Sequence, residues 1–262
     1  MSTFDRNSAQ RYGMAGGHAD AASFDAGLRA YMLSVYNYMA VGLVITGLMA
    51  MAVAALATAP AGSPQAVAQI KSDLFLTEFG VMLYTSPLRW VVMLAPLGMV
   101  FLLGARVHKM SVSGAQMMFW TFAAIMGISL SSIFLVYTSS SIARVFFITA
   151  ISFGGLSLYG YTTKKSLSGW GSFLMMGLIG IIVASIVNYF VGSSALHFAI
   201  SVIGVLVFAG LTAYDTQRIK EMYAAVDSSD IAGKKAIMGA LTLYLDFINM
   251  FMMLLSLFGN RD

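Results

Sequence analysis

Seven long apolar stretches constrain the architecture of this 262-residue chain more than any other feature. The hydrocarbon core of a membrane is ~30 Å thick, and an α-helix needs ~20 apolar residues to cross it. None of the stretches alternates apolar and polar residues as a lipid-facing barrel strand does. We therefore predict an all-α integral membrane protein with seven transmembrane helices, at residues 35–57, 88–105, 114–137, 145–161, 173–191, 196–214 and 236–258.

The composition supports a membrane protein and excludes several functions. Apolar residues make up 59% of the chain and charged residues 10%, whereas soluble domains average about 45–50% and about 25%. There is no cysteine, so disulfides, thiolate metal sites and cysteine nucleophiles are excluded. The net charge of +4 comes without a long basic run. We therefore expect the lipid bilayer, and not nucleic acid, as a partner.

Residues 1–27 differ in composition from the rest of the chain. They are rich in Gly, Ala and Ser, contain three aspartates and have few large apolar side chains. They also lack the apolar core of about 7–15 residues that marks a secretory signal peptide. We expect a disordered cytoplasmic tail there, followed by the seven-helix transmembrane domain over residues 28–262.

The basic residues predict the orientation in the membrane. Eleven of the 15 lie in one set of alternate segments between the spans, and four lie in the other set. Because loops rich in Lys and Arg stay in the cytoplasm, the N-terminus is expected there and the C-terminus outside. The larger set is Arg6, Arg11, Arg29, Arg106, Lys109, Lys164, Lys165, Arg218, Lys220, Lys234 and Lys235, and the smaller is Lys71, Arg89, Arg144 and Arg261.

Two aspartates lie within or at the edge of the apolar stretches, Asp215 in "AYDTQRIK" and Asp246 in "LYLDFINMF". A charged side chain at the bilayer centre costs at least ~2.5–3.5 kcal/mol, so an intramembrane carboxylate is a candidate functional group. Asp246 should lie ~16 Å from the cytoplasmic surface and Asp215 ~7–8 Å from it, at ~1.5 Å per helical residue. The two helices are consecutive and antiparallel, so the carboxylates are offset by ~8 Å if both helices begin at the surface.

Structural roles remain open for both aspartates. Asp215 could pair with Arg218 at i+3, and Asp246 could be a protonated core carboxyl beside Asn249. If the two carboxylates meet, they cannot both ionise cheaply, so they would share one proton. Such a pair suits a proton sensor and, at higher pH, a transient site for a hard divalent cation such as calcium. The supporting polar groups expected from the two motifs are Tyr214, Arg218, Tyr244 and Asn249.

Four segments resemble the Bax inhibitor-1 family, also called the transmembrane Bax inhibitor motif family, and most closely its bacterial inner-membrane members. They read "GLTAYDTQRIK", "GALTLYLDFINMFMMLLSLFGNRD", "LSSIFLVYTSSSIARVFFITA" and "SLYGYTTKKSLSGWG". The resemblance implies six helices packed around a central seventh. It also implies a pH-sensitive calcium leak whose aspartate pair carries over onto Asp215 and Asp246. The arginine that is thought to latch this pair in some members is left unassigned, because Arg89 and Arg106 lie at opposite ends of the second helix.

The function expected first is a proton-gated cation leak of the bacterial inner membrane. It is not an enzyme and uses no cofactor, and calcium is its permeant ion. An alternative is a non-conducting regulator that binds a membrane protease or a partner in a stress or death pathway. Lesser alternatives are a proton-coupled small-molecule transporter and an intramembrane aspartyl protease. The protease also needs two aspartates that share a proton, but presenilin-like enzymes have G-x-G-D where this chain has Leu243 and Leu245 before Asp246.

Overall fold

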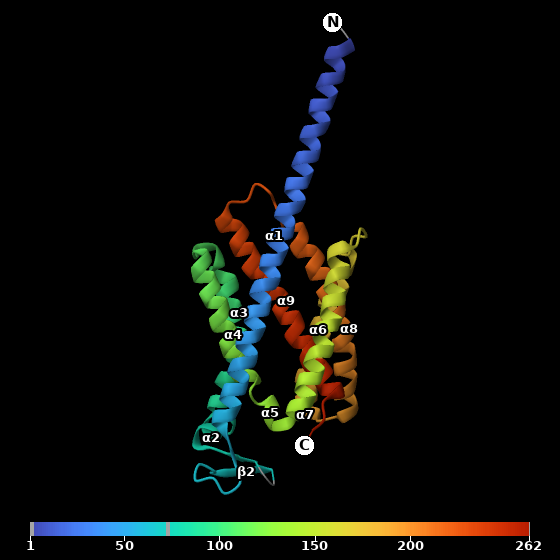
Figure 1. Cartoon of the computed structure of the whole chain (residues 1–262). Helices are drawn as coiled ribbons and strands as arrows, with labels where there is room; N and C mark the ends of the chain where they lie inside the picture. The colour runs from blue at the N-terminus through green and yellow to red at the C-terminus, as the bar shows by residue number, and fades with distance from the viewer. Residues whose placement is uncertain (1–2, 72–73, 262) are drawn as a thin grey trace.

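The computed structural model describes the backbone of residues 3–71 and 74–261, and the side chains of residues 24–70 and 74–261. Seven long helices form a bundle (Figure 1): α1 (Thr3–Ala57), α3 (Leu88–Arg106), α4 (Val112–Leu130), α6 (Ser139–Thr162), α7 (Gly171–Val191), α8 (Ser194–Glu221) and α9 (Ser229–Phe258). Short helices lie between them: α2 (Glu78–Tyr84), η1 (Val107–Lys109), α5 (Ile133–Val136) and η2 (Ser168–Trp170).

The seven predicted transmembrane helices are confirmed. Seven helical segments of the described chain are long and apolar enough to cross a membrane: Phe24–Ala57, Leu88–Lys109, Val112–Val136, Ser139–Thr162, Ser168–Val191, Ser194–Glu221 and Ser229–Phe258. Several are longer than predicted because a Ser or Thr side chain caps the helix ahead of its first apolar residue. Thr138, Ser193 and Ser228 each accept a hydrogen bond from a backbone N–H in the first turn of the helix that follows.

The first helix extends into the segment that was predicted to be disordered. α1 begins at Thr3, and Figure 1 shows its first half projecting beyond the ends of the other helices. The backbone of residues 3–27, where a disordered tail is expected from the sequence, thus lies within α1. Nothing in the local sequence stops the helix, because the first proline of the chain is Pro60.

A small antiparallel sheet follows α1. Its strands are β1 (Thr58–Pro60), β2 (Ala68–Lys71) and β3 (Leu74–Leu76), in the order β1-β3-β2. The turn after β1 contains Gly62 at a φ of 80°, a conformation that favours glycine. The helix that follows β3 is α2, which begins after Thr77, whose side chain accepts a hydrogen bond from the Gly80 N–H.

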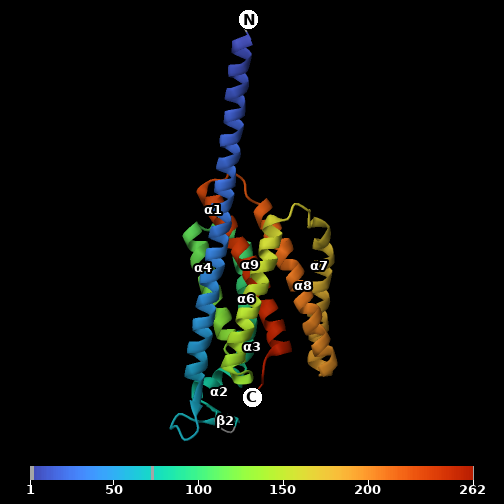
Figure 2. The same ribbon diagram turned by 45° about the vertical axis from the view of Figure 1, so that its right-hand side comes forward.

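The last helix, α9, is the most buried of the seven. Of its most apolar window, 56% is buried, compared with 11% for α7. It packs against α1, α4, α6 and α8, while α3 lies mainly against α4 and α7 mainly against α8 (Figure 2). The arrangement of six helices around a central seventh is therefore not confirmed, because α3 and α7 contact their neighbours rather than surrounding α9.

The C-terminal end of α9 is attached to the start of α6. The backbone N–H of Asn260 donates to Ser141 Oγ at 2.9 Å, and the Asn260 carbonyl accepts from the Thr138 N–H at 3.2 Å. The Arg261 guanidinium lies over the Tyr137 ring, 5.6 Å from its centroid. These contacts fix the end of α9 at the opposite end of the bundle from its start.

Glycines let α6 approach α8 closely beside Asp215. A methyl group at Gly160 would meet the Ala213 carbonyl oxygen and would lie 3.0 Å from Ala213 Cα. Because these are backbone atoms, no change of side-chain rotamer could make room for the methyl group, and one helix would have to move away from the other. In α7, a methyl group at Gly177 would lie 2.9 Å from the Val207 side chain, whereas one at Gly180 would meet nothing within 4 Å.

We predict that Gly160→Ala destabilises the protein. The added methyl forces α6 and α8 apart, and overpacking of this kind costs ~1–3 kcal/mol. The measurement is thermal unfolding in detergent, with Gly155→Ala in the same helix as the matched control, because a methyl at Gly155 meets nothing within 4 Å. Equal melting temperatures for the two variants would contradict the close contact.

Candidate functional site

The structure brings Asp215 and Asp246 together between α8 and α9. Their carboxyl groups lie close enough together for each to influence the other. Both are buried, with exposed fractions of 8% and 5%. Two acids separated by thirty residues of chain therefore form one enclosed site within the membrane-spanning part of the protein.

The oblique path of α9 brings Asp246 to the level of Asp215. If both helices began at the membrane surface and ran parallel, the two aspartates would lie at different depths. Asp215 lies six residues before the end of α8 at Glu221, and Asp246 lies 17 residues after the start of α9 at Ser229. At ~1.5 Å per residue these distances along the helices are ~9 Å and ~26 Å. Figure 1 and Figure 2 show α9 crossing the bundle obliquely, so its first turns lie beside α3 and α4 rather than beside α8. Its middle then reaches the level of Asp215.

A hydrogen bond between the two carboxyl groups would require a proton. Asp246 Oδ2 is buried, and the described residues provide no N–H or other ordinary donor for it. An ionised carboxylate only accepts hydrogen bonds, so two carboxyl groups can bond to each other only if one of them is protonated. Ionising both would place two like charges side by side away from water. Two buried carboxyl groups placed side by side generally share one proton.

Arg218 is near the pair but does not neutralise it directly. Its side chain is exposed, and its charge acts on Asp215 from a distance. The ion pairs among the side chains that the structure describes are Lys234–Asp230 and Lys235–Asp227, so Arg218 forms none with Asp215. The interpretation of Asp215 as one half of a surface ion pair is therefore not supported by the geometry.

The other predicted supporting groups bond elsewhere. Tyr244 is fully buried, and its hydroxyl bonds to Thr46 Oγ1 at 2.6 Å. Asn249 donates to the carbonyl of Leu245 in its own helix at 2.8 Å. The half-buried Tyr214 packs against the start of α7 at Gly171. These three side chains position the helices around the pair rather than bonding to it.

The Tyr244 hydroxyl belongs to a network that joins three helices. Thr46 Oγ1 lies 2.9 Å from the Gly42 carbonyl oxygen and 2.8 Å from the Ala123 carbonyl oxygen. The Tyr244 ring packs edge-on against Phe119 and Phe122. α9 is thereby attached to α1 and α4 one half-turn before Asp246.

A chain of hydroxyl groups on the other side of the pair was not predicted from the sequence. Tyr36 Oη lies 2.7 Å from Ser157 Oγ, which lies 2.9 Å from Thr216 Oγ1. These groups connect α1, α6 and α8 at the residue next to Asp215. The signal in the sequence was the polar run "DTQR" at the end of an apolar helix, but it did not reveal the partners.

Gln217 and Lys220 hold the end of α8 against the connection between α6 and α7. Gln217 accepts from the Leu167 N–H at 2.7 Å and donates to the Lys165 carbonyl at 2.9 Å. Lys220 Nζ donates to the Tyr161 carbonyl at 2.8 Å. Asp215 therefore lies on a part of α8 that is fixed by bonds at consecutive turns.

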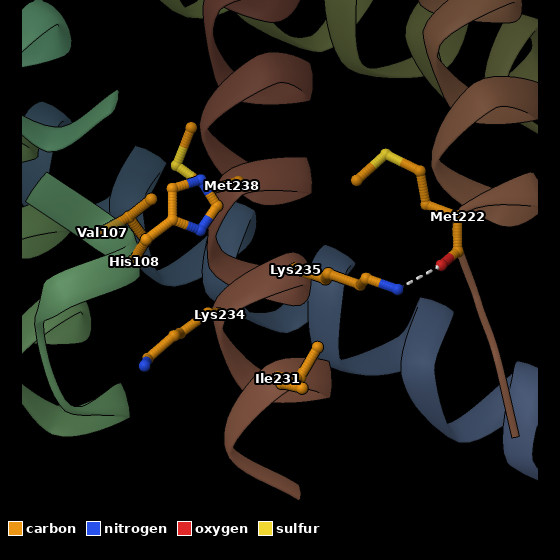
Figure 3. Close-up of a pocket in the computed structure, with 7 residues that line it drawn as sticks. All are labelled: Val107, His108, Met222, Ile231, Lys234, Lys235 and Met238. Atoms are coloured by element: carbon orange, nitrogen blue, oxygen red, sulfur yellow. Dashed lines mark hydrogen bonds between the residues drawn. The ribbon is translucent and has the colours of Figure 1, made fainter. Parts of the chain in front are cut away.

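A cavity of about 220 Å³ lies where η1, the end of α8 and the start of α9 meet (Figure 3). Lys235 reaches across it and donates to the Met222 carbonyl at 3.0 Å, and it also forms an ion pair with Asp227 at 2.6 Å. Figure 3 shows Lys234 pointing the other way. The two lysines and His108 make this lining basic, so the cavity is not suited to attracting cations. The bonds of Lys235 instead hold the connection at residues 222–228 in place.

The acid pair is not a complete metal site. Calcium takes about 6–8 oxygen ligands, and no group of three or more His, Cys, Asp or Glu side chains capable of holding a metal occurs in the described part of the chain. Any calcium at the pair would depend on water and backbone oxygens for its remaining ligands. Transient occupation by a passing ion fits these residues better than a resident ion.

The fold and the site define a multi-pass helical membrane protein with a buried acid pair between its last two helices. The chain matches the family described as "Inhibitor of apoptosis-promoting Bax1" over residues 28–262, and it belongs to that family. The resemblance seen in the four sequence segments is thereby confirmed.

Bacterial relatives match most of the chain. The inner membrane protein YbhL of Escherichia coli K12 is 46% identical over 239 residues, which are 90% of this chain and 94% of the relative. An uncharacterized protein of Rickettsia prowazekii is 47% identical over 239 residues, covering 91% and 93%. One from Caulobacter vibrioides is 47% identical over 247 residues, covering 92% of each.

We predict that Lys235→Met loosens the connection at residues 222–228. The substitution removes a charge-assisted bond to a mostly buried Asp227 and a bond to Met222, a loss of ~1–2 kcal/mol. Limited proteolysis of the connection and thermal unfolding measure the effect. Lys234→Met is the control, because its i,i+4 pair with the exposed Asp230 contributes only ~0.3–0.5 kcal/mol. Equal protease sensitivity in both variants would show that Lys235 does not hold the connection.

Proposed function

We propose that the protein is a pH-sensitive cation leak in the bacterial inner membrane, with calcium as the permeant ion. The observation that carries the proposal is the contact between Asp215 and Asp246, two buried carboxyls with no cation bonded to either in the described structure. Such a pair responds strongly to the loss of one proton, since the exposed Arg218 acts on Asp215 only from a distance.

The gate works through the charge of the pair. With one proton bound, the carboxyl–carboxylate bond holds the middle of α9 against α8. When the proton is lost, two negative charges face each other in a site closed to water. They must then separate, hydrate or take up a cation. A calcium ion entering at that moment replaces the proton as the positive charge between the oxygens, and it leaves again because the protein supplies too few ligands to retain it.

The flux of calcium through reconstituted protein should rise with pH and should lose this dependence in Asp215→Asn and Asp246→Asn. A neutral asparagine mimics the protonated state at every pH, so flux above the transition should fall at least about tenfold, which corresponds to ~1.4 kcal/mol of coupling. The double variant should add little, because the two residues act as one site. Calcium-dye-loaded liposomes provide the measurement.

The control for this experiment is Asp230→Asn, an exposed acid in the same helix. A folded Asp246→Asn protein with wild-type flux at every pH would overturn the proton gate. A folded wild-type protein with no flux at any pH would overturn the leak itself. That second result would favour the alternative of a non-conducting regulator that binds a membrane protease or a stress-pathway partner.

The proposed orientation places the N-terminus in the cytoplasm. It is supported by the eleven basic residues in one set of segments, and the inner membrane is supported by the name of the Escherichia coli relative. Seven crossings then put the two termini on opposite sides, as Figure 1 draws them at opposite ends of the bundle. Fusions of a cytoplasm-active reporter should give a signal at the N-terminus and none at the C-terminus. A signal at both ends would require an even number of crossings.

A further inference from the structure

A groove of about 600 Å³ lies between α1 and α6. Its sides are formed by apolar groups that include Leu33, Phe153 and Leu158. It extends from the level of Arg29 to that of Tyr36 on α1, a distance of ~10 Å at ~1.5 Å per residue. Both helices span the membrane, so the groove is a recess in the membrane-spanning region.

Gly154 keeps this groove open. A Cβ at Gly154 would meet no atom within 4 Å, so the absence of a side chain there is not required by a neighbouring helix. The deepest polar groups, Tyr36 Oη and Ser157 Oγ, bond to each other at 2.7 Å. The groove is therefore an apolar channel in which these two hydroxyl groups are already hydrogen-bonded. A hydrocarbon chain can lie over them without leaving a polar group unsatisfied.

The N-terminal end of the groove is positively charged. Arg29 lines it, is exposed, and forms no ion pair with any side chain that the structure describes. Tyr161 lines the same end, and Lys220 lies over its ring at 5.5 Å while donating to its carbonyl. A guanidinium presents several N–H donors in one plane, an arrangement that suits the oxygens of a phosphate group.

We propose that this groove is a binding site for a membrane phospholipid. One acyl chain lies along Leu33, Phe153 and Leu158, and the headgroup phosphate bonds to Arg29. An apolar channel alone would accept any hydrocarbon, and an exposed arginine alone would accept any anion. The apolar channel and the arginine occur in one groove, which is long enough for one headgroup and part of an acyl chain. Together they match an amphiphile that has a phosphate at one end.

The test measures the thermal stability of the detergent-solubilised protein with three additives. Phosphatidylglycerol supplies both phosphate and chains, diacylglycerol supplies chains only, and inorganic phosphate supplies the anion only. We expect phosphatidylglycerol to raise the melting temperature the most. Native mass spectrometry should show a phosphatidylglycerol molecule retained on the protein. Equal stabilisation by diacylglycerol or by inorganic phosphate would overturn the proposal, since one half of the ligand would then suffice.

Matched variants locate the site. Gly154→Phe should fill the groove and abolish lipid retention, whereas Gly155→Phe should not, although both positions face open space in the same helix. Arg29→Gln should weaken phosphatidylglycerol binding at least about tenfold, with the exposed Arg106→Gln as its control. Gly154→Leu serves as a second blocking variant if the phenylalanine impairs folding. Lipid retention by Gly154→Phe equal to that of Gly155→Phe would place the lipid elsewhere and overturn the proposal.

Discussion

The contact between two buried carboxyl groups is the interaction on which the rest of this structure depends. Asp215 and Asp246 lie close to each other, and both side chains are buried. Charged side chains are expensive in such surroundings, and two like charges are more so. In the proposed function, a proton shared by the pair is part of the packing of α8 and α9.

Three sets of contacts determine how far apart the carboxyls can lie. The backbones of α6 and α8 touch at Gly160 and Ala213, the hydroxyls of Tyr36, Ser157 and Thr216 join α1 and α6 to α8, and Tyr244 bonds to Thr46 on α1. These contacts lie within about one turn of one or other aspartate. The separation of the pair is therefore fixed by helix positions more than by side-chain rotation, so a change in its charge must act on the helices themselves.

The sequence was sufficient to predict the seven spans, because hydrocarbon thickness imposes a length that apolar runs reveal directly. It also identified the two aspartates, because charge inside such runs is rare. It did not reveal their contact, since the estimate of depth assumed that both helices start at the membrane surface, and the slant of α9 is set by tertiary packing. The hydroxyl chain at Thr216 could not be predicted either, because Tyr36 and Ser157 lie in distant segments of the sequence and meet only through tertiary packing. The small sheet after α1 was missed because its strands are only three or four residues long.

The attachment of α9 at both ends has a mechanical consequence. Lys235 joins its first turns to Met222 and Asp227, and Asn260, two residues beyond its end, is bonded to the start of α6. A rod that is pinned at both ends cannot slide along its axis like a piston. Repulsion between carboxyls near its midpoint can only bow it or twist it about its own length. The deflection is then largest beside Asp246 and vanishes toward the two membrane surfaces, so a passage formed in this way would open from the middle outward.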